Sequence, residues 1–269
     1  MLSTLKVALV QVAAGRDRAR NLARVRELLE GVPPVDLIAL PEVFSLRGSD
    51  DDYRAGSEAI PGPTTAWLSD LARRRNAWVL GGSLIERARG RLFNTSALVS
   101  RSGRIAATYR KIHLFEARLE NGMVIRERDV YGPGREPRMV RVNRWPSGMA
   151  VCYDLRFPEL FRHYVGRGAR LLLVPSNFTQ RTGKDHWEIL VRARAIENQC
   201  FVLAPNQCGA NAVTGVASHG HSLIVGPWGE VLGQAGKRDE VLVAELDPAV
   251  LETTRRRIPA LRHRQPGLF

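Results

Sequence analysis

Short apolar runs alternate with longer amphipathic segments along the whole chain. The apolar runs predict strands at residues 6–12, 36–42, 77–84, 95–100, 104–111, 148–152, 169–176, 201–207, 221–227 and 241–247. Segments with a helical repeat predict helices over residues 17–31, 64–76, 158–168 and 185–200. Because strands and helices alternate without repeats, low-complexity segments or linkers, residues 1–269 are expected to form a single α/β domain.

Local signals mark the ends of two of these helices. Pro158 opens the helix over 158–168 and Gly168 closes it. Asp185 and Glu188 have the spacing of a capping box, which predicts that the last helix begins at Asp185.

The chain is strongly basic, with a formal net charge of +13 and a pI near 10.7. Such a charge is compatible with a nucleic-acid partner. However, the basic residues are spread along the chain and many stand beside acids, as in RVRELLE. RNP, KH, zinc-finger and helix-turn-helix patterns are all missing from the sequence. A nucleic-acid-binding protein is therefore the remote alternative.

Cysteine usage and apolar run lengths bear on the compartment. The three cysteines include no C-x-x-C pair, which favours free thiols in a reducing compartment such as the cytoplasm. The N-terminal MLSTLKVALVQVAAG has no basic region ahead of a long apolar one, so no signal peptide is expected. The longest apolar stretches, such as ARLLLVP, are far shorter than the ~20 residues of a membrane span.

Three predicted strands end on chemically active residues: Glu42 in ALPEVF, Lys111 in YRKIHLF and Cys152 in AVCYD. Enzymes of the α/β class place reactive groups where strands meet loops. A thiol at a strand-to-helix turn has the geometry of a nucleophile elbow. A carboxylate can act as its base, and an ammonium with a backbone N–H can stabilise an oxyanion. The three residues therefore form a complete set for acyl transfer.

Each of these residues also has a structural interpretation. A cysteine after an apolar run is usually a small core residue, and a glutamate after Leu-Pro is usually a solvated turn residue. Only four of the forty basic residues are lysine, so Lys111 indicates a compact ammonium with a tunable pKa. Spacing alone leaves both interpretations open.

The segments LPEVF, YRKIHLFE and CYDLRFPEL resemble the Glu–Lys–Cys signature of the nitrilase (carbon–nitrogen hydrolase) superfamily. The resemblance covers essentially the full chain. It implies a four-layer α-β-β-α sandwich, pairing of subunits into a homodimer or an assembly of dimers, and a cysteine-acyl intermediate without a metal or organic cofactor. It makes Glu42 the general base, Lys111 the oxyanion-side cation and Cys152 the nucleophile. A second family glutamate corresponds to Glu127 in IRERDVYGPG, where it orients Lys111 or the substrate nitrogen.

The segment TGKDHWEILVRARAIENQCFVLAPNQCG resembles the deaminated-glutathione amidase and omega-amidase branch of that family. This implies hydrolysis of a primary amide of a small acid, with release of ammonia from a Cys152 thioester. Omega-amidase, N-carbamoyl amide hydrolase and true nitrilase activities remain alternatives. A catalytically dead scaffold is disfavoured because Glu42, Lys111 and Cys152 are all present.

An acidic amide requires a cation to bind its carboxylate. Arg181 and Lys184 precede the helix start predicted at Asp185, so they are candidates, although solvated loop charges explain them equally well. The remaining substrate-binding candidates are Tyr153, Asn177, Phe178 and His186.

Other chemically active residues receive structural roles. Cys200 and Cys208 are expected to pack rather than react. His219 and His221 lack nearby Cys or carboxylate partners, so no metal site is expected. The strand before Cys152 is expected to begin late, because NRWPSG departs from the family pattern. The segment RRIPALRHRQPGLF (256–269) has no obvious strand or helix, and by the family resemblance the tail over 254–269 is expected to pack on a partner subunit.

Overall fold

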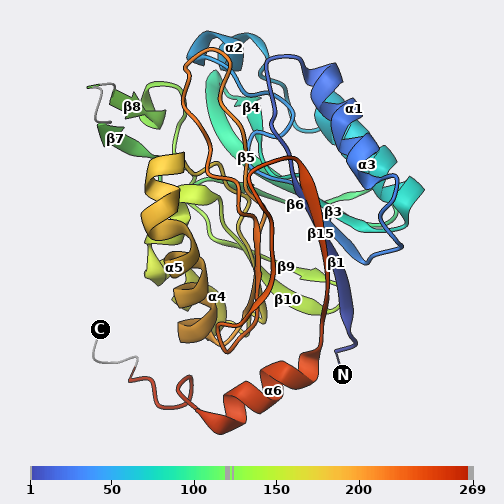
Figure 1. The fold of residues 1–269 in the computed structure, drawn as a ribbon, viewed down its shortest axis with the longest axis vertical. Coiled ribbons are helices and arrows are strands. Elements are labelled where there is room, and N and C mark those ends of the chain that lie inside the picture. The colour runs from blue at the N-terminus through green and yellow to red at the C-terminus, as the bar shows by residue number, and fades with distance from the viewer. Residues whose placement is uncertain (1, 119–121, 123, 266–269) are drawn as a thin grey trace.

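Two β-sheets stacked face to face form the centre of the computed structural model, which describes residues 2–118, 122 and 124–265 (Figure 1). The seven-stranded sheet has the order β15 (Glu240–Leu246), β1 (Leu5–Gln11), β2 (Leu37–Ala39), β3 (Trp78–Leu80), β5 (Arg91–Val99), β4 (Leu84–Ala88), and β6 (Ile105–Arg110) also pairs with β5. The six-stranded sheet has the order β14 (Val231–Gln234), β13 (Leu223–Val225), β12 (Phe201–Ala204), β11 (Leu171–Leu173), β10 (Trp145–Met149), β9 (Arg138–Val142).

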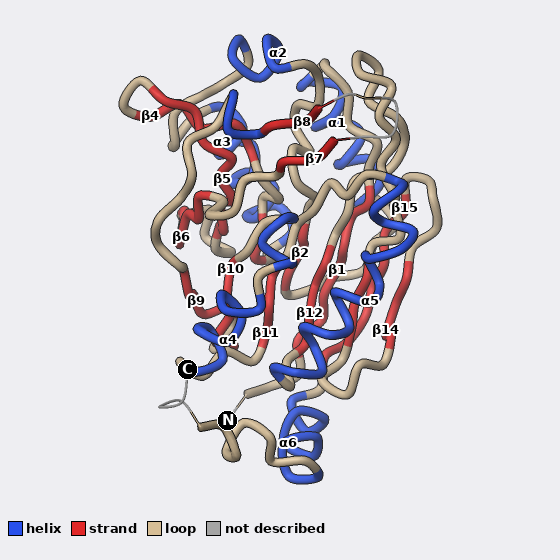
Figure 2. Tube along the Cα trace, turned by 90° about the vertical axis from the view of Figure 1, so that its left-hand side faces the viewer, coloured by secondary structure: helices blue, strands red, loops and turns tan. Residues whose placement is uncertain are grey.

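Helices cover the outer face of each sheet. The seven-stranded sheet packs against α1 (Arg18–Leu29) and α3 (Pro63–Arg75). The six-stranded sheet packs against α4 (Pro158–Gly166) and α5 (Gln180–Asn198), which lie across its face in Figure 2. The structure is therefore the four-layer α-β-β-α sandwich expected from the sequence.

The remaining elements lie at the two ends of the sandwich (Figure 1). One end carries α2 (Asp50–Ala55) and the hairpin of β7 (Glu116–Arg118) and β8 (Val124–Arg126), which leads into the 3₁₀ turn η1 (Glu127–Asp129). The other end carries α6 (Pro248–Arg257). A second 3₁₀ turn, η2 (Cys152–Arg156), leads from the six-stranded sheet into α4.

The alternation of side chains along β1 explains the layering. Leu5, Val7 and Leu9 belong to the core that includes the facing sheet, whereas Ala8 and Val10 pack with the side chains of α1 and α3. Because successive side chains of a strand point to opposite faces, a continuous apolar run marks a strand buried on both faces. None of these five side chains is accessible to solvent.

Several predicted boundaries are wrong. The strand predicted over 148–152 is β10 (Trp145–Met149), which begins earlier than expected and ends three residues before Cys152. Of the strand predicted over 77–84, only β3 (Trp78–Leu80) forms as one strand, and the last predicted residue, Leu84, begins the separate strand β4. The helix predicted from Asp185 begins at Gln180 with Thr179 as its N-cap, so Asp185 lies inside α5.

Other elements gave no recognised sequence signal. These are the short elements α2, β7, β8, β9 and β14. The helix α6 also gave no recognised sequence signal. It includes residues 254–257 of the segment expected to be a C-terminal tail. Leu261 of that segment packs against the main core, while residues 266–269 lie outside the described residues.

Within the described ranges, no helix combines the length and the apolar character that a membrane crossing requires.

Candidate active site

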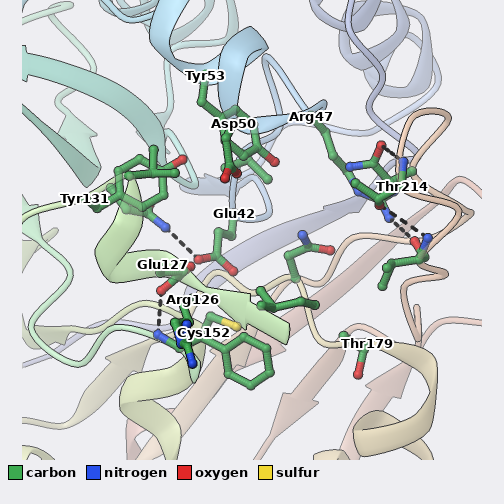
Figure 3. A pocket seen from close by; sticks show the side chains of 18 of the residues that line it. Glu42, Arg47, Asp50, Tyr53, Arg126, Glu127, Tyr131, Cys152, Thr179 and Thr214 are labelled. Atoms are coloured by element: carbon green, nitrogen blue, oxygen red, sulfur yellow. Dashed lines mark hydrogen bonds between the residues drawn. The ribbon is translucent and has the colours of Figure 1, made fainter. Parts of the chain in front are cut away.

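A cavity of about 660 Å³ opens at the end of the sandwich that carries α2 and the β7–β8 hairpin. Its walls come from Asn94, Lys111 and Phe115 and from the segments 42–54, 124–131, 152–156, 177–182 and 211–218. Figure 3 shows Glu42, Glu127 and Cys152 gathered on one side of the cavity, with Arg47 and Thr214 on the far side. A cavity of this size is typical of sites for small organic ligands.

Lys111 lies between two carboxylates at the inner wall of this cavity. It directly follows β6, and its Nζ donates to Glu42 Oε1 at 2.9 Å and to Glu127 Oε1 at 2.8 Å. Asn94 Nδ2 donates to the same Glu42 oxygen at 2.8 Å, and the Phe115 N–H donates to Glu127 Oε2 at 2.7 Å. These bonds fix the ammonium and both carboxylates in one arrangement.

Burial and charge act in opposite directions on Lys111. Burial alone would lower the pKa of Lys111, but the negative charges of Glu127 and Glu42 outweigh it and raise this pKa well above the ordinary value. Burial raises the pKa of Glu127, and the attraction of Lys111 offsets only part of that rise. At neutral pH the inner wall therefore presents an ammonium ion held by acidic groups.

Cys152 forms a sharp turn at the edge of the cavity. Its backbone has a φ of 49°, in the left-handed region, and its N–H donates to Pro175 O at 2.9 Å. Within the described part of the chain, the next N–H, that of Tyr153, has no acceptor. The turn thus places a thiol and an unpaired backbone donor beside each other, as in a nucleophile elbow.

The thiol of Cys152 is protonated in the resting site. Burial raises the pKa of Cys152 well above its ordinary value, and the charge of Glu42 raises it further. Lys111 and the Asn177 backbone N–H lower it, but not enough to reverse the rise. Reaction of this thiol therefore requires a base, and the Glu42 carboxylate is close enough to influence it.

The structure brings seven of the nine predicted site residues to this cavity. The four predicted catalytic residues and three predicted substrate-binding residues line it: Glu42, Lys111, Glu127, Cys152, Tyr153, Asn177 and Phe178. Arg181 and His186, together with Lys184, the second candidate cation, are not among its lining residues. Because α5 begins at Gln180, these three side chains occupy exposed positions of a helix rather than a loop facing the site.

Four arginines line the cavity, and the sequence analysis singles out none of them. Arg54 donates to Asp129 O and Arg126 pairs with Glu116, which leaves Arg156 and Arg47. Arg156, in the η2 turn, has its guanidinium carbon 5.8 Å from the Tyr153 ring centroid and 5.6 Å from that of Phe178. Its position four residues after Cys152 was the available signal. Among the described residues, His186 contacts the cavity lining through Arg156, since its Nδ1 lies 3.3 Å from Arg156 Nη2.

Arg47 is the second arginine, and it is only 2% exposed. Its guanidinium donates to the carbonyl oxygens of Cys208, Gly209 and Val216, and burial lowers its pKa. It therefore ties the loop after Glu42 to the loop over 208–216 on the opposite wall. In a chain with so many arginines, no sequence pattern separated it from the others.

The other predicted features lie outside the cavity lining. Cys200 and Cys208 are buried, free and absent from that lining. Among the described residues, no group of three or more His, Cys, Asp or Glu side chains has a geometry that could hold a metal ion.

Comparison with known proteins identifies close relatives over the full chain. The sequence profile described as carbon-nitrogen hydrolase matches residues 6–256. Deaminated glutathione amidase from Synechocystis sp. is 34% identical over 264 residues, covering 96% of this chain and 97% of that protein. Omega-amidase NIT2 from Danio rerio is 33% identical over 270 residues, covering 100% of this chain and 97% of that protein.

A solved structure has the same fold. The crystal structure of the C. elegans NitFhit protein superposes with a TM-score of 0.91 at 33% sequence identity. The match covers 100% of this chain and 66% of that chain.

Proposed function

Because the chain belongs to the carbon-nitrogen hydrolase family, and so is a hydrolase of non-peptide C–N bonds, we propose that Cys152 is its nucleophile and a primary amide of a small acid its substrate. One observation carries this proposal: Lys111 bridges Glu42 and Glu127 on the wall of the cavity that Cys152 also lines. An ammonium, a base and a thiol in one cavity are the groups that cysteine-dependent acyl transfer requires.

In the first step, Cys152 Sγ attacks the amide carbon while Glu42 takes the thiol proton. The amide oxygen becomes an oxyanion, which Lys111 Nζ and the unpaired Tyr153 N–H stabilise. Glu42 then gives the proton to the leaving nitrogen, so that ammonia departs and a thioester remains on Cys152.

In the second step, a water molecule hydrolyses the thioester. Glu42 accepts a proton from the water, the hydroxyl adds to the acyl carbon, and the thiol of Cys152 leaves with that proton. The products are a carboxylic acid and the original thiol. Glu127 orients Lys111 throughout, because its Oε1 accepts the second ammonium hydrogen bond.

Arg156 replaces Arg181 and Lys184 as the group proposed to bind the substrate carboxylate. It lines the cavity, and the Tyr153 and Phe178 rings hold its guanidinium. Within the described residues, its only polar side-chain partner is His186 Nδ1, which is not a carboxylate. A guanidinium that is not already paired with a carboxylate can form a bidentate bond with the carboxylate of an acidic substrate.

A substrate panel tests the proposal. Deaminated glutathione, 2-oxoglutaramate, an N-carbamoyl amino acid and a nitrile are each incubated with the protein, and release of ammonia and of the acid product is measured. Turnover of an acidic amide that disappears in the Cys152→Ala variant supports the assignment. Turnover of none of the four would contradict it.

Omega-amidase activity is the second candidate. It is favoured by the Danio rerio omega-amidase, whose match covers the full length of this chain. The ratio of kcat/KM for 2-oxoglutaramate to that for deaminated glutathione distinguishes the two activities.

We also propose that the protein is a homodimer or an assembly of dimers, with residues 254–269 packing partly on the partner. Three apolar side chains support a subunit interface on the outer layer: Ile189 is 70% exposed, and Ile196 and Trp228 are each 50% exposed. Ile189 and Ile196 lie on one helix, α5, two turns apart. Light scattering of the wild type and of Ile196→Glu tests this, since the variant should shift toward monomer.

The cytoplasm is the proposed compartment. Its support is the presence of three free cysteines, none of them in a disulfide. Cell fractionation with the tagged full chain is the test.

A further inference from the structure

Asp154 is a fully buried carboxylate two residues after Cys152, and it is not among the residues that line the cavity. Its Oδ2 accepts hydrogen bonds from the Val151 N–H at 2.8 Å and the Tyr109 hydroxyl at 2.7 Å. Its Oδ1 accepts from the His113 N–H at 3.0 Å and lies 2.7 Å from His113 Nδ1. Oδ2 thus joins two segments of the chain, and Oδ1 bonds to His113 in one of them.

The partners of this carboxylate stand beside the two reactive groups. Val151 directly precedes Cys152, while Tyr109 and His113 each lie two residues from Lys111. Lys111 follows β6 of the seven-stranded sheet, and Cys152 follows β10 of the six-stranded sheet. One carboxylate therefore connects the lysine-bearing segment of one sheet to the cysteine-bearing turn of the other.

The cysteine turn requires such support. A residue with a side chain is strained in the left-handed region, and Cys152 has a φ of 49°. Its conformation persists only if the surrounding structure fixes it. The Cys152 N–H bond to Pro175 O supplies one constraint, and the bond from Val151 N–H to Asp154 supplies another.

His113 adds rigidity to the same connection. Its ring stacks on Phe157, with centroids 3.7 Å apart and planes 8° apart, and Phe157 lies directly after η2. The lysine segment therefore contacts the cysteine turn through a stacked ring as well as through Asp154.

We propose that Asp154 is a positioning residue that sets the placement of Lys111 Nζ relative to Cys152 Sγ. It acts through these two groups and touches no substrate, since the cavity does not reach it. This proposal rests on the acylation chemistry assigned above to Cys152 and Lys111.

Replacement by asparagine tests the carboxylate in an almost unchanged shape. Each oxygen of Asp154 faces a backbone N–H, from Val151 on one side and His113 on the other. A backbone N–H cannot accept a hydrogen bond, so the amide NH₂ of Asp154→Asn opposes a donor in either orientation. Tyr109→Phe is milder, because it removes one hydroxyl and leaves both backbone bonds.

Asp36→Asn is the matched control. Its carboxylate also joins the two sheets, because Oδ2 accepts from the Lys6 N–H at 2.9 Å and Oδ1 accepts from Asn143 Nδ2 at 3.0 Å. Asp36 precedes β2 whereas Glu42 follows it, so this link lies at the opposite end of the sheet from the site.

The experiment measures kcat, KM and the pH dependence of Cys152 alkylation by iodoacetamide for all three variants. Asp154→Asn should lower kcat about 100-fold and leave KM nearly unchanged, because binding groups stay while reacting groups are misplaced. Its alkylation midpoint should move to higher pH, because the ammonium that lowers the pKa of Cys152 is displaced. Tyr109→Phe should also lower kcat and raise the alkylation midpoint, but by less than Asp154→Asn. Asp36→Asn should change neither kcat nor the midpoint.

Two results would overturn the proposal. One is a folded Asp154→Asn protein with wild-type kcat and alkylation profile, and the other is an equal loss in Asp36→Asn. If Asp154→Asn does not fold, kcat and the alkylation profile of Tyr109→Phe test the proposal instead, and wild-type values of both would overturn it. If the wild type hydrolyses no amide, the proposed function fails, whereas the alkylation profiles still test the positioning role of Asp154.

Discussion

Lys111 Nζ lies 2.9 Å from Glu42 Oε1, and water reaches only 1% and 4% of the two side chains. Removing one member of a buried ion pair leaves an unpaired charge and typically costs about 3–5 kcal/mol of stability. Variants that keep the shape of the side chain are therefore the informative ones at this site.

Cys152→Ala is expected to abolish turnover and leave the fold intact, because the cavity survives loss of one sulfur. Iodoacetamide should modify Cys152 before Cys200 and Cys208. Burial raises the pKa of all three thiols, so access decides the order: Cys152 lines the cavity, whereas Cys200 and Cys208 do not. Peptide mapping by mass spectrometry gives the order of labelling, and loss of activity upon labelling of Cys200 or Cys208 alone would contradict the assignment.

Glu42→Gln should lower kcat by about 10²–10⁴, because a general base is lost. The same variant should make Cys152 more reactive toward iodoacetamide at pH 8. Since the charge of Glu42 raises the pKa of Cys152, a neutral side chain lowers that pKa and increases the thiolate fraction. Alkylation rates from pH 6 upward check this, and a rate at pH 8 no higher than that of the wild type would refute the charge coupling.

Lys111→Arg should also lower kcat by a factor of about 100 or more, because a planar guanidinium does not fit a site made for a compact ammonium. The double variant with Glu42→Gln should be little slower than the slower single variant, since both residues serve one step. Strict additivity of the two changes in activation free energy would show that they act independently.

Arg156→Ala should raise KM for acidic amides much more than KM for neutral amides, because it removes the proposed carboxylate partner. Lys184→Ala is the matched control: it removes a positive charge from an exposed position of α5 outside the cavity. Initial rates on an acidic and a neutral amide of equal length give the comparison. Equal effects of Arg156→Ala on both substrates would remove the support for an anionic substrate.

The free energy of unfolding should decrease as the pH falls from about 6.5 toward 4, because of His219. Burial, together with His221 and Lys237, lowers the pKa of His219 to about 4, against 6.5 for the free side chain. Over that interval the unfolded chain binds a proton that the folded chain does not, so the free energy of unfolding decreases. Urea midpoints at pH 7 and pH 4.5 should differ less in His219→Gln than in the wild type, and an equal difference would argue against this histidine.

The sequence singled out residues that the fold brings to one cavity, because each of them follows a predicted apolar strand. Glu42 follows β2, and Lys111 directly follows β6. The sequence could not show that the chain turns into the left-handed region at Cys152, or that a cavity forms there. Both depend on contacts with residues distant in the chain, such as Pro175.

The start of α5 was misplaced because tertiary packing overrides local preference. Gly183 disfavours a helix by about 1 kcal/mol relative to alanine, so Asp185 was the stronger local signal for a start. In the structure a Cβ at Gly183 would lie 2.2 Å from the His219 ring, so the helix accepts glycine to let this ring approach. The loop expected to hold Arg181 and Lys184 is instead the beginning of α5.

The broken strand at 77–84 has a similar origin. Gly82 has a φ of 44°, and a Cβ there would lie 1.8 Å from Pro41 O, so close backbone approach separates β3 from β4. A local pattern of apolar residues carries no information about that neighbour.

The enclosure of Lys111 has a practical consequence for handling the protein. Lys6, Lys184 and Lys237 are exposed, whereas Lys111 is 1% exposed and its raised pKa keeps the amine protonated. Amine-directed reagents, such as succinimidyl esters, should therefore attach dyes or a solid support to three surface lysine side chains. The enzyme can be tagged or immobilised in this way with Lys111 chemically untouched.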